Sequence, residues 1–226
     1  MKTILILFCL FFLTYAISAQ TSEIIYEDVK LTDIGSISIP SIMELQSGVY
    51  KELSNQVSKE LGFDVSGVII YQQAGLNDIF KKLRKPNTYA RLMIKEISGK
   101  AGEYRSLNSK LVLTPRELKL LDTQSKDELI SQFQLSGVDM KLIRWDGVSV
   151  DKISGFDVLK TAYLRQLNNN PSVYVELYYI ENYDRQYTLT ISYREEDSSI
   201  WKDTLNKTKN SFKITNIRKP ATKRRS

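Results

Sequence analysis

Two neighbouring strand-like segments carry the polar side chains that come closest to forming a site. In residues 173–180 and 187–194, successive side chains point to opposite faces, as they do along a β-strand. Tyrosine combines a flat apolar ring with a hydroxyl, which suits contact with a glycan, a lipid or a protein. A sheet face half covered by a helix would show the same pattern. The candidate ligand or partner face consists of Tyr174, Glu176, Tyr178, Thr188, Thr190, Ser192 and Arg194.

The chemistry open to an enzyme is narrow. The sequence contains no histidine, and its one cysteine is Cys9. With Cys9 inside a segment that export removes, imidazole bases, thiolate nucleophiles and His or Cys zinc sites are excluded. Glu176 and Glu195 could pair for glycoside hydrolysis, but Glu195 is also explained as negative charge at a helix N-terminus. We therefore predict a protein that is not an enzyme, with no catalytic residues, no cofactor and no metal site.

The first 19 residues have the pattern of a cleavable secretory signal peptide. Lys2 precedes an apolar run over residues 4–13, and small residues follow at Ala16 and Ala19. The apolar run is shorter than a confident membrane span, although a retained N-terminal anchor is the alternative. We predict cleavage near residue 19 and export to the periplasm or the medium. The mature chain would then have no cysteine and no disulfide.

The remaining residues are predicted to form one domain, 20–214, and a basic tail, 215–226. One domain is the common outcome for a chain of this length. The tail lacks apolar periodicity and ends in a run of lysines and arginines, which is typical of a disordered terminus. Weak contact with an anionic surface is its functional interpretation, and a solvated end is the favoured one. No specific nucleic-acid partner is predicted.

Periodicity places regular elements along the first part of the domain. Thr114 to Glu117 has the pattern of a helix-capping box, which recurs at Ser125 to Glu128, so we predict two short helices or one kinked helix there. Asp146-Gly147 suits a two-residue hairpin turn. The further predictions are strands at 35–40, 65–72 and 89–97, helices at 48–61 and 76–83, and strands at 140–145 and 148–153.

The last part of the domain is predicted to be a hairpin covered by its own following helix. The polar link 181–185 joins the two strands, and Trp201, Leu205 and Phe212 recur at near-helical spacing after it. Asp197 or Ser198 is the expected helix cap. The face predicted to enter the core consists of Val173, Val175, Leu177, Tyr179, Tyr187, Leu189, Ile191 and Tyr193. Residues 155–167 fit both periods, with the helical one slightly better.

Several of these segments together resemble the PsbP-like superfamily. They are Gly35 to Pro40, Ile153 to Phe156 leading into Tyr163 and Arg165, the two long strands, and the closing Asn210 to Ile214 with Trp201 before it. The resemblance spans roughly residues 35–214. It implies an α+β fold, a mostly antiparallel β-sheet with helices packed on its faces in an α/β/α sandwich, and makes 155–167 a strand. Residues 71–77 and 192–195 also resemble features of exported Bacteroidetes envelope proteins.

Together these features predict a noncatalytic accessory or protein-binding domain of the bacterial cell envelope. Its expected partner is another envelope protein, since the resemblance implies a superfamily used mostly for docking. The alternative is a small-molecule or glycan binder that uses the tyrosine and threonine face, which requires a concave pocket beside Tyr174 and Tyr178. A carboxylate-based hydrolase is the third hypothesis.

Overall fold

Most of the chain is organised around one antiparallel sheet. The computed structural model describes residues 23–60, 65–77 and 88–219. Within these ranges, seven strands pair in the order β3–β4–β5–β9–β8–β7–β6, and every neighbouring pair is antiparallel. The strands are β3 (Met43–Leu45), β4 (Ile69–Gln73), β5 (Ala90–Ser98), β6 (Met140–Ile153), β7 (Phe156–Leu167), β8 (Val173–Glu181) and β9 (Arg185–Arg194).

A smaller sheet joins the two ends of the domain. Its order is β1–β2–β10, with β1 (Tyr26–Leu31), β2 (Gly35–Pro40) and β10 (Lys213–Ile214). Gly35 lies directly against β10, where a Cβ atom would stand 1.8 Å from the Lys213 carbonyl oxygen. Position 35 therefore requires a residue without a side chain.

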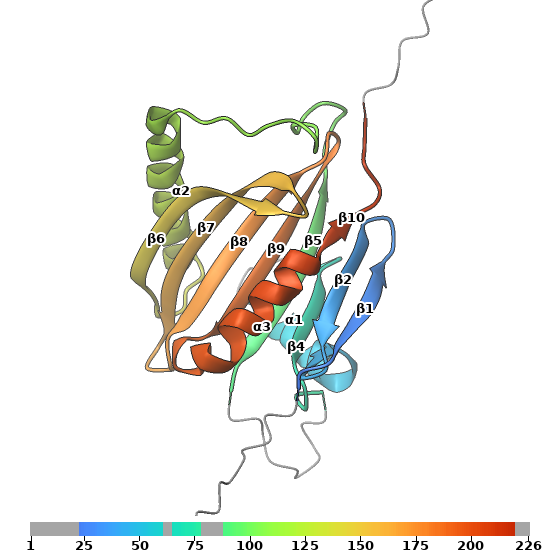
Figure 1. The fold of residues 1–226 in the computed structure, drawn as a ribbon. Coiled ribbons are helices and arrows are strands. Elements are labelled where there is room, and N and C mark those ends of the chain that lie inside the picture. Colours follow the sequence, from blue (N-terminus) through green and yellow to red (C-terminus); the bar gives the residue numbers. More distant parts are fainter. Residues whose placement is uncertain (1–22, 61–64, 78–87, 220–226) are drawn as a thin grey trace, which may run out of the picture.

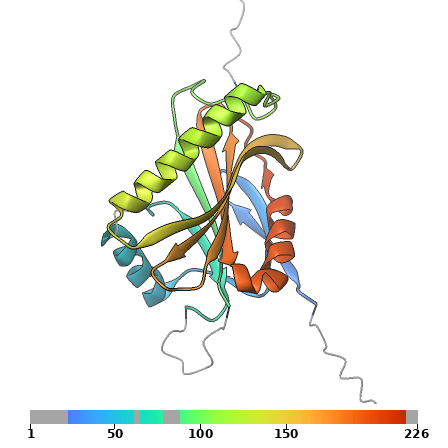
Figure 2. The same ribbon diagram turned by 90° about the vertical axis from the view of Figure 1, so that its left-hand side faces the viewer.

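The helices form a layer on each side of the large sheet. They are α1 (Gly48–Glu60), α2 (Pro115–Leu135) and α3 (Ser198–Ser211), and a short 3-10 turn, η1 (Glu195–Asp197), precedes α3. Figure 1 shows α3 crossing one face of the sheet beside the smaller sheet. In Figure 2, α1 and α2 lie on the opposite side from α3. The predicted α+β class, an antiparallel sheet with helices on its faces, is confirmed.

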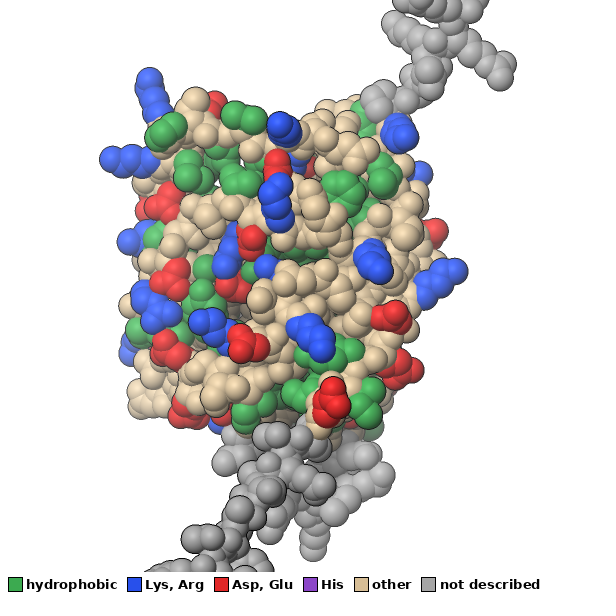
Figure 3. Space-filling view, in the orientation of Figure 1, with side chains coloured by type: hydrophobic (Ala, Val, Ile, Leu, Met, Phe, Trp, Pro, Cys, Tyr) green, Lys and Arg blue, Asp and Glu red, His purple; other side chains and the backbone are tan. Residues whose placement is uncertain are grey.

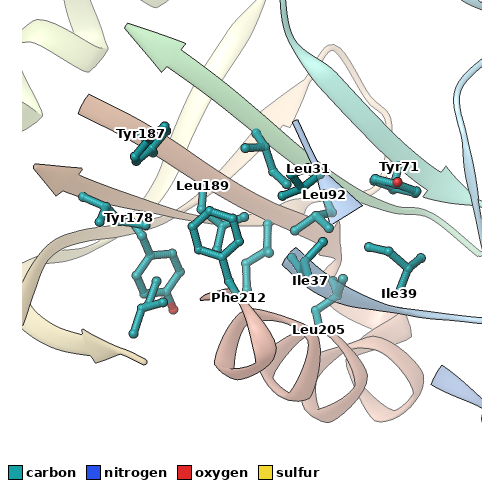
Figure 4. Close-up of a cluster of buried hydrophobic side chains, with 14 of the residues drawn as sticks. Leu31, Ile37, Ile39, Tyr71, Leu92, Tyr178, Tyr187, Leu189, Leu205 and Phe212 are labelled. Carbon is teal, nitrogen blue, oxygen red and sulfur yellow. The ribbon is translucent and has the colours of Figure 1, made fainter. Parts of the chain in front are cut away.

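The core lies between the central strands, the smaller sheet and α3. Leu92, Leu189 and Ile191 from the large sheet meet Ile37 and Ile39 from β2 in one buried cluster (Figure 4). The alternation of residues 35–40 predicts this inward face correctly. Trp201 and Leu205 of α3, and Phe212 directly after it, are also buried in this cluster, as the sequence predicts.

The structure decides one open alternative in α2 and corrects one prediction in β6. The Thr114–Glu117 capping box is present, and α2 continues as one helix through the second expected start at Ser125, so the alternative of two short helices is wrong. Strand β6 runs through Asp146-Gly147 without turning, and its register shifts there instead. The turn lies at Ser154 and Gly155, which both have positive φ, as a two-residue hairpin turn of type I′ requires.

Within the segment 155–167, residues 156–167 form strand β7, so the implication of the PsbP-like resemblance is correct there and the helical period is misleading. Apolar side chains on both faces explain the ambiguity. Val158 and Leu164 are buried on one face, and Tyr163 is buried on the other against Trp145 and Phe133. A strand covered on both faces has no strict alternation.

The first residues of the predicted tail, 215–218, make hydrogen bonds with the domain. Thr215 donates its backbone N–H to Ile34, and the Arg218 N–H is bound by the buried side chain of Asn182. Ordered contacts therefore continue beyond Ile214. The predicted signal peptide, most of the 76–83 helix and residues 220–226 lie outside the described residues. No helix of the described part is long and apolar enough to cross a bilayer.

Candidate functional site

A groove of about 580 Å³ lies between α3 and the α3-side face of β6, β7 and β8. Figure 3 views this face, on which acidic and basic side chains are intermixed beside α3. Its lining residues are mostly polar: Arg144, Asp146, Asp151, Lys160, Tyr174, Glu176, Tyr178, Tyr193, Glu195, Ser198, Lys202, Asp203, Asn206 and Lys209.

The pairing of β8 with β9 decides which of the predicted site residues reach this groove. Glu176 is opposite Ile191 and Tyr178 is opposite Leu189, so these side chains face α3. The prediction that Val175 shares a face with Ile191 is wrong. The link between the strands is the three residues 182–184, with Tyr183 in the left-handed region (φ 65°). A one-residue difference in register turns every side chain of one strand to the other face.

The seven predicted site residues are therefore split between two faces. Tyr174, Glu176 and Tyr178 line the groove. The other four side chains, Thr188, Thr190, Ser192 and Arg194, lie on the opposite face. There they neighbour Val175, Leu177 and Tyr179 of β8, which the sequence placed in the core. The prediction that the seven form one surface is wrong.

The wall of the groove opposite α3 depends on an irregularity in β6. Register shifts between Leu142 and Arg144, and between Trp145 and Gly147, bring Arg144 and Asp146 to the groove. The carboxylate of Asp122 on α2 accepts hydrogen bonds from the Trp145 side chain (2.9 Å) and the Val148 backbone (2.8 Å). The helix on one face of the sheet thus fixes the bulge that shapes the other face.

One end of the β6–β7 hairpin also contacts the end of α3. The hydroxyl of Ser154, in the hairpin turn, donates a hydrogen bond to the Phe212 carbonyl oxygen. Phe212 itself is fully buried in the core. This contact ties the hairpin to the helix at one end of the groove.

At the floor, Lys160 and Glu176 form a partly buried ion pair of 2.5 Å. Glu176 also accepts a hydrogen bond of 2.8 Å from the Tyr178 hydroxyl. Burial, and next the negative charge of Glu176, raise the pKa of Tyr178 well above its usual value. Tyr178 therefore remains a neutral hydrogen-bond donor, and its ring lies at the margin of the core beside Leu189 and Phe212 (Figure 4).

A second ion pair joins α3 to β6. Lys209 has a side chain only 7% exposed, and its ammonium lies 3.2 Å from Asp151 and 5.0 Å from the centre of the Tyr178 ring. Burial acts to raise the pKa of Asp151, but the Lys152 backbone N–H and the Lys209 charge lower it overall. Asp151 is thus held as an anion that compensates the buried lysine.

Arg144 bridges the groove at its more exposed end. Its guanidinium binds Asp146 on its own strand (2.7 Å) and Glu195 of η1 (3.0 Å), and lies 5.8 Å from the centre of the Tyr174 ring. Tyr174 in turn packs against Tyr193. Burial, followed by nearby carboxylates, raises the pKa of Tyr193 to about 12.

The sequence missed the cations that complete the groove. Arg144, Lys160 and Lys209 come from three different elements, and nothing in their local patterns marks them. Lys209 lies in a segment of alternating lysines and polar residues, a pattern that is typical of the solvent-exposed surface of a helix. The expected capping role of Asp197 is also different, because its carboxylate accepts the Tyr89 backbone N–H at 2.9 Å instead of capping α3.

The groove does not have the composition of a metal centre. Among the described residues, there is no group of three or more His, Cys, Asp or Glu side chains that could hold a metal ion. Glu176 and Glu195, the acids considered for hydrolysis, both line the groove, and each is paired with a different cation.

Comparisons with known proteins give likenesses of structure alone. No protein-family model matches the sequence, and no curated protein matches it. A protein from Bacteroides thetaiotaomicron is similar at 11% identity and a TM-score of 0.42, over 79% of this chain and 44% of that one. The chain therefore spans less than half of that protein's length.

Two further solved structures are similar over most of their length. Cyanobacterial PsbP from Synechocystis shares 12% identity at a TM-score of 0.47, over 84% of this chain and 92% of that one. A Pseudomonas aeruginosa protein of unknown function, PA94, a putative regulator, shares 11% identity at a TM-score of 0.37, over 87% and 99%. At these identities and TM-scores, none of the three likenesses carries an argument about function.

Proposed function

We propose that the chain is an exported, noncatalytic binding domain and that the groove beside α3 holds a polar ligand. The main observation behind the proposal is that Tyr174, Glu176 and Tyr178, three of the residues that the sequence nominated for binding, line a concave groove. Its volume of about 580 Å³ falls in the range of ligand pockets. Such pockets are mostly apolar, whereas ionised and hydroxyl groups dominate this one, which favours a polar ligand over a lipid or a flat aromatic molecule.

Two features of the sequence support binding without catalysis. The chain has no histidine, and its one cysteine lies in the predicted signal peptide, so an imidazole base and, after removal of that segment, a thiolate nucleophile are missing. The pattern of the first 19 residues supports export. An exported binding domain of the cell envelope agrees with both.

The experiment is a thermal-shift screen with neutral sugars, amino acids and nucleosides. The test variant is Lys160→Met with Glu176→Gln, which removes both charges of the floor pair and leaves an acceptor for Tyr178. The matched control is Lys141→Met with Asp139→Asn, which removes an exposed ion pair outside the groove lining.

We expect at least one class of probe to raise the melting temperature of the wild type and of the control. The floor variant should lose the shift while remaining folded by circular dichroism. A shift that survives in the floor variant would place binding elsewhere. The absence of any shift with all three classes would contradict the proposal.

A second candidate function, docking to another envelope protein, is favoured by one observation. Val49, Leu53 and Val57 recur every four residues on α1, and their exposed fractions are 47%, 47% and 53%. Affinity purification from envelope extract should recover a specific partner with the wild type and lose it with Leu53→Lys. Equal recovery by both baits, or none by a folded wild type, would exclude this surface.

A further inference from the structure

The cations at the floor and mouth of the groove already have anionic partners within the protein. Lys160 is paired with Glu176, Lys209 with Asp151, and Arg144 with Asp146 and Glu195. The first two pairs are the deeper ones, since the side chains of Lys160, Glu176 and Lys209 are 22%, 15% and 7% exposed. The floor of the groove therefore presents charged atoms without offering a vacant counter-charge, whereas Lys202 and Asp203 of α3, which also line the groove, are exposed side chains.

An ionic ligand is poorly matched to this arrangement. A carboxylate or phosphate that bound Lys160 would compete with Glu176, and a displaced Glu176 would remain mostly buried without its cation. Removing one partner from such a pair is costly because the other charge stays desolvated. A cationic ligand that bound Glu176 or Asp151 would displace Lys160 or Lys209 and leave that lysine desolvated without its anion.

A neutral ligand with several hydroxyls avoids that cost. A carboxylate has about four acceptor positions and an ammonium has three donors, so both keep hydrogen-bonding capacity after they pair. A hydroxyl donates and accepts at once, and two adjacent hydroxyls could bind Glu176 and Lys160 together while the ion pair stays intact. The Asn206 amide, which lines the groove from α3, can also donate and accept.

The aromatic part of the groove complements the carbon skeleton of such a ligand. Tyr174 is partly exposed and packs against Tyr193, and Arg144 lies over its ring. Arg144 and Tyr193 cover part of the Tyr174 ring, and the part that stays exposed gives the groove an apolar surface beside polar groups, against which the C–H face of a sugar ring can pack.

We propose that the ligand of the groove is a neutral saccharide, bound through its hydroxyls to the ion pairs Lys160–Glu176 and Lys209–Asp151. The inference rests on the proposed binding function and narrows it to one class of ligand. The paired charges supply orientation, and a floor on which each charge already has a partner favours a neutral ligand over uronic acids and other ionic compounds.

The test is isothermal titration calorimetry with maltose and cellobiose as neutral probes, and glucuronate and glucosamine as charged ones. The titrations are run at low salt and at about 0.5 M NaCl, where charge attraction between ligand and protein is screened. We expect a neutral disaccharide to bind with an affinity that salt leaves nearly unchanged. The variant Lys160→Met with Glu176→Gln should weaken it by about tenfold or more, and Lys141→Met with Asp139→Asn should not.

The outcomes separate this inference from the proposed function. If glucuronate or glucosamine binds in a salt-dependent way and the neutral sugars do not, the assignment of a neutral saccharide fails and the proposal of a polar-ligand groove stands. If neutral sugars bind equally well to the floor variant, the saccharide site is not this groove. If no probe of any class binds, the saccharide assignment and the proposed function are both overturned.

Discussion

The docking of α3 on the sheet can be tested through Trp201. This side chain is 2% exposed and belongs to the buried cluster with Leu205 and Phe212, so Trp201→Ala should leave a large cavity. Truncation of a buried tryptophan costs about 3–5 kcal/mol of unfolding free energy. The assay is urea denaturation followed by far-UV circular dichroism.

Trp201→Phe gives a sharper version of this prediction. The indole N–H of Trp201 is buried and has no hydrogen-bond partner among the described residues. An unsatisfied buried donor costs about 1–3 kcal/mol, so losing it offsets much of the lost packing. We expect Trp201→Phe to change stability by no more than about 1 kcal/mol.

Trp145 is the matched control because its indole N–H is satisfied. It donates to Asp122 at 2.9 Å, and a hydrogen bond to a charged group contributes about 1.5–3 kcal/mol. Trp145→Phe should therefore cost more than Trp201→Phe. A cost of less than about 1 kcal/mol for Trp201→Ala would contradict the docking of α3 through Trp201. A reversed order of the two phenylalanine variants would contradict the roles given to the two indole N–H groups.

Two further predictions concern the bulge and the tyrosines. Asp122→Ala should lower the free energy of unfolding, measured by urea denaturation, by about 1–3 kcal/mol because the Trp145 and Val148 donors lose their acceptor. Asp127→Ala, at an exposed position of the same helix, should change the free energy of unfolding little. Equal effects of the two variants would contradict the role of Asp122 in holding the bulge. Because the pKa of Tyr193 is raised to about 12, its contribution to stability is full below the ordinary tyrosine pKa of about 10 and is lost as pH rises through 12. Ultraviolet titration of tyrosinate should lose a late-ionising component in Tyr193→Phe, and an unchanged curve would argue against it.

The sequence predicts the elements of the hairpin and of α3 better than it predicts their register. Alternation identifies both strands, and the spacing of Trp201, Leu205 and Phe212 identifies the helix. The alternation of β8 is ambiguous because residues on both of its faces are apolar or aromatic. Only the length of the link between β8 and β9 decides which side chains of β8 face α3. A link one residue longer or shorter would turn the other set of side chains toward α3.

The turn at residues 154–155 was missed for a related reason. Asp146-Gly147 is the stronger turn signal, but Gly147 uses its positive φ (99°) within a bulge of β6. The hairpin instead turns at Ser154, a residue seldom found with positive φ. The pairing of β6 with β7 along their whole length, from Met140 opposite Leu167 to Ile153 opposite Phe156, overrides the local preference.

The candidate site could be predicted only in part, since a groove is a property of the assembled layers. Tyr174, Glu176 and Tyr178 were identified from strand chemistry. Their cations come from β6, β7 and α3, and only the assembled fold brings these elements to one place. Lys209 shows the limit most clearly, because a lysine in a polar helix segment gives no sign that it is buried.

The most direct test of saccharide binding in the groove is to map a bound neutral disaccharide by amide chemical shifts in a titration with maltose or cellobiose. We expect saturable shifts at Lys160, Tyr174 and Asn206, which line the groove, and none at Thr190 on the opposite face of the sheet. Shifts centred on Thr190, or no shifts at saturating sugar, would contradict saccharide binding in the groove.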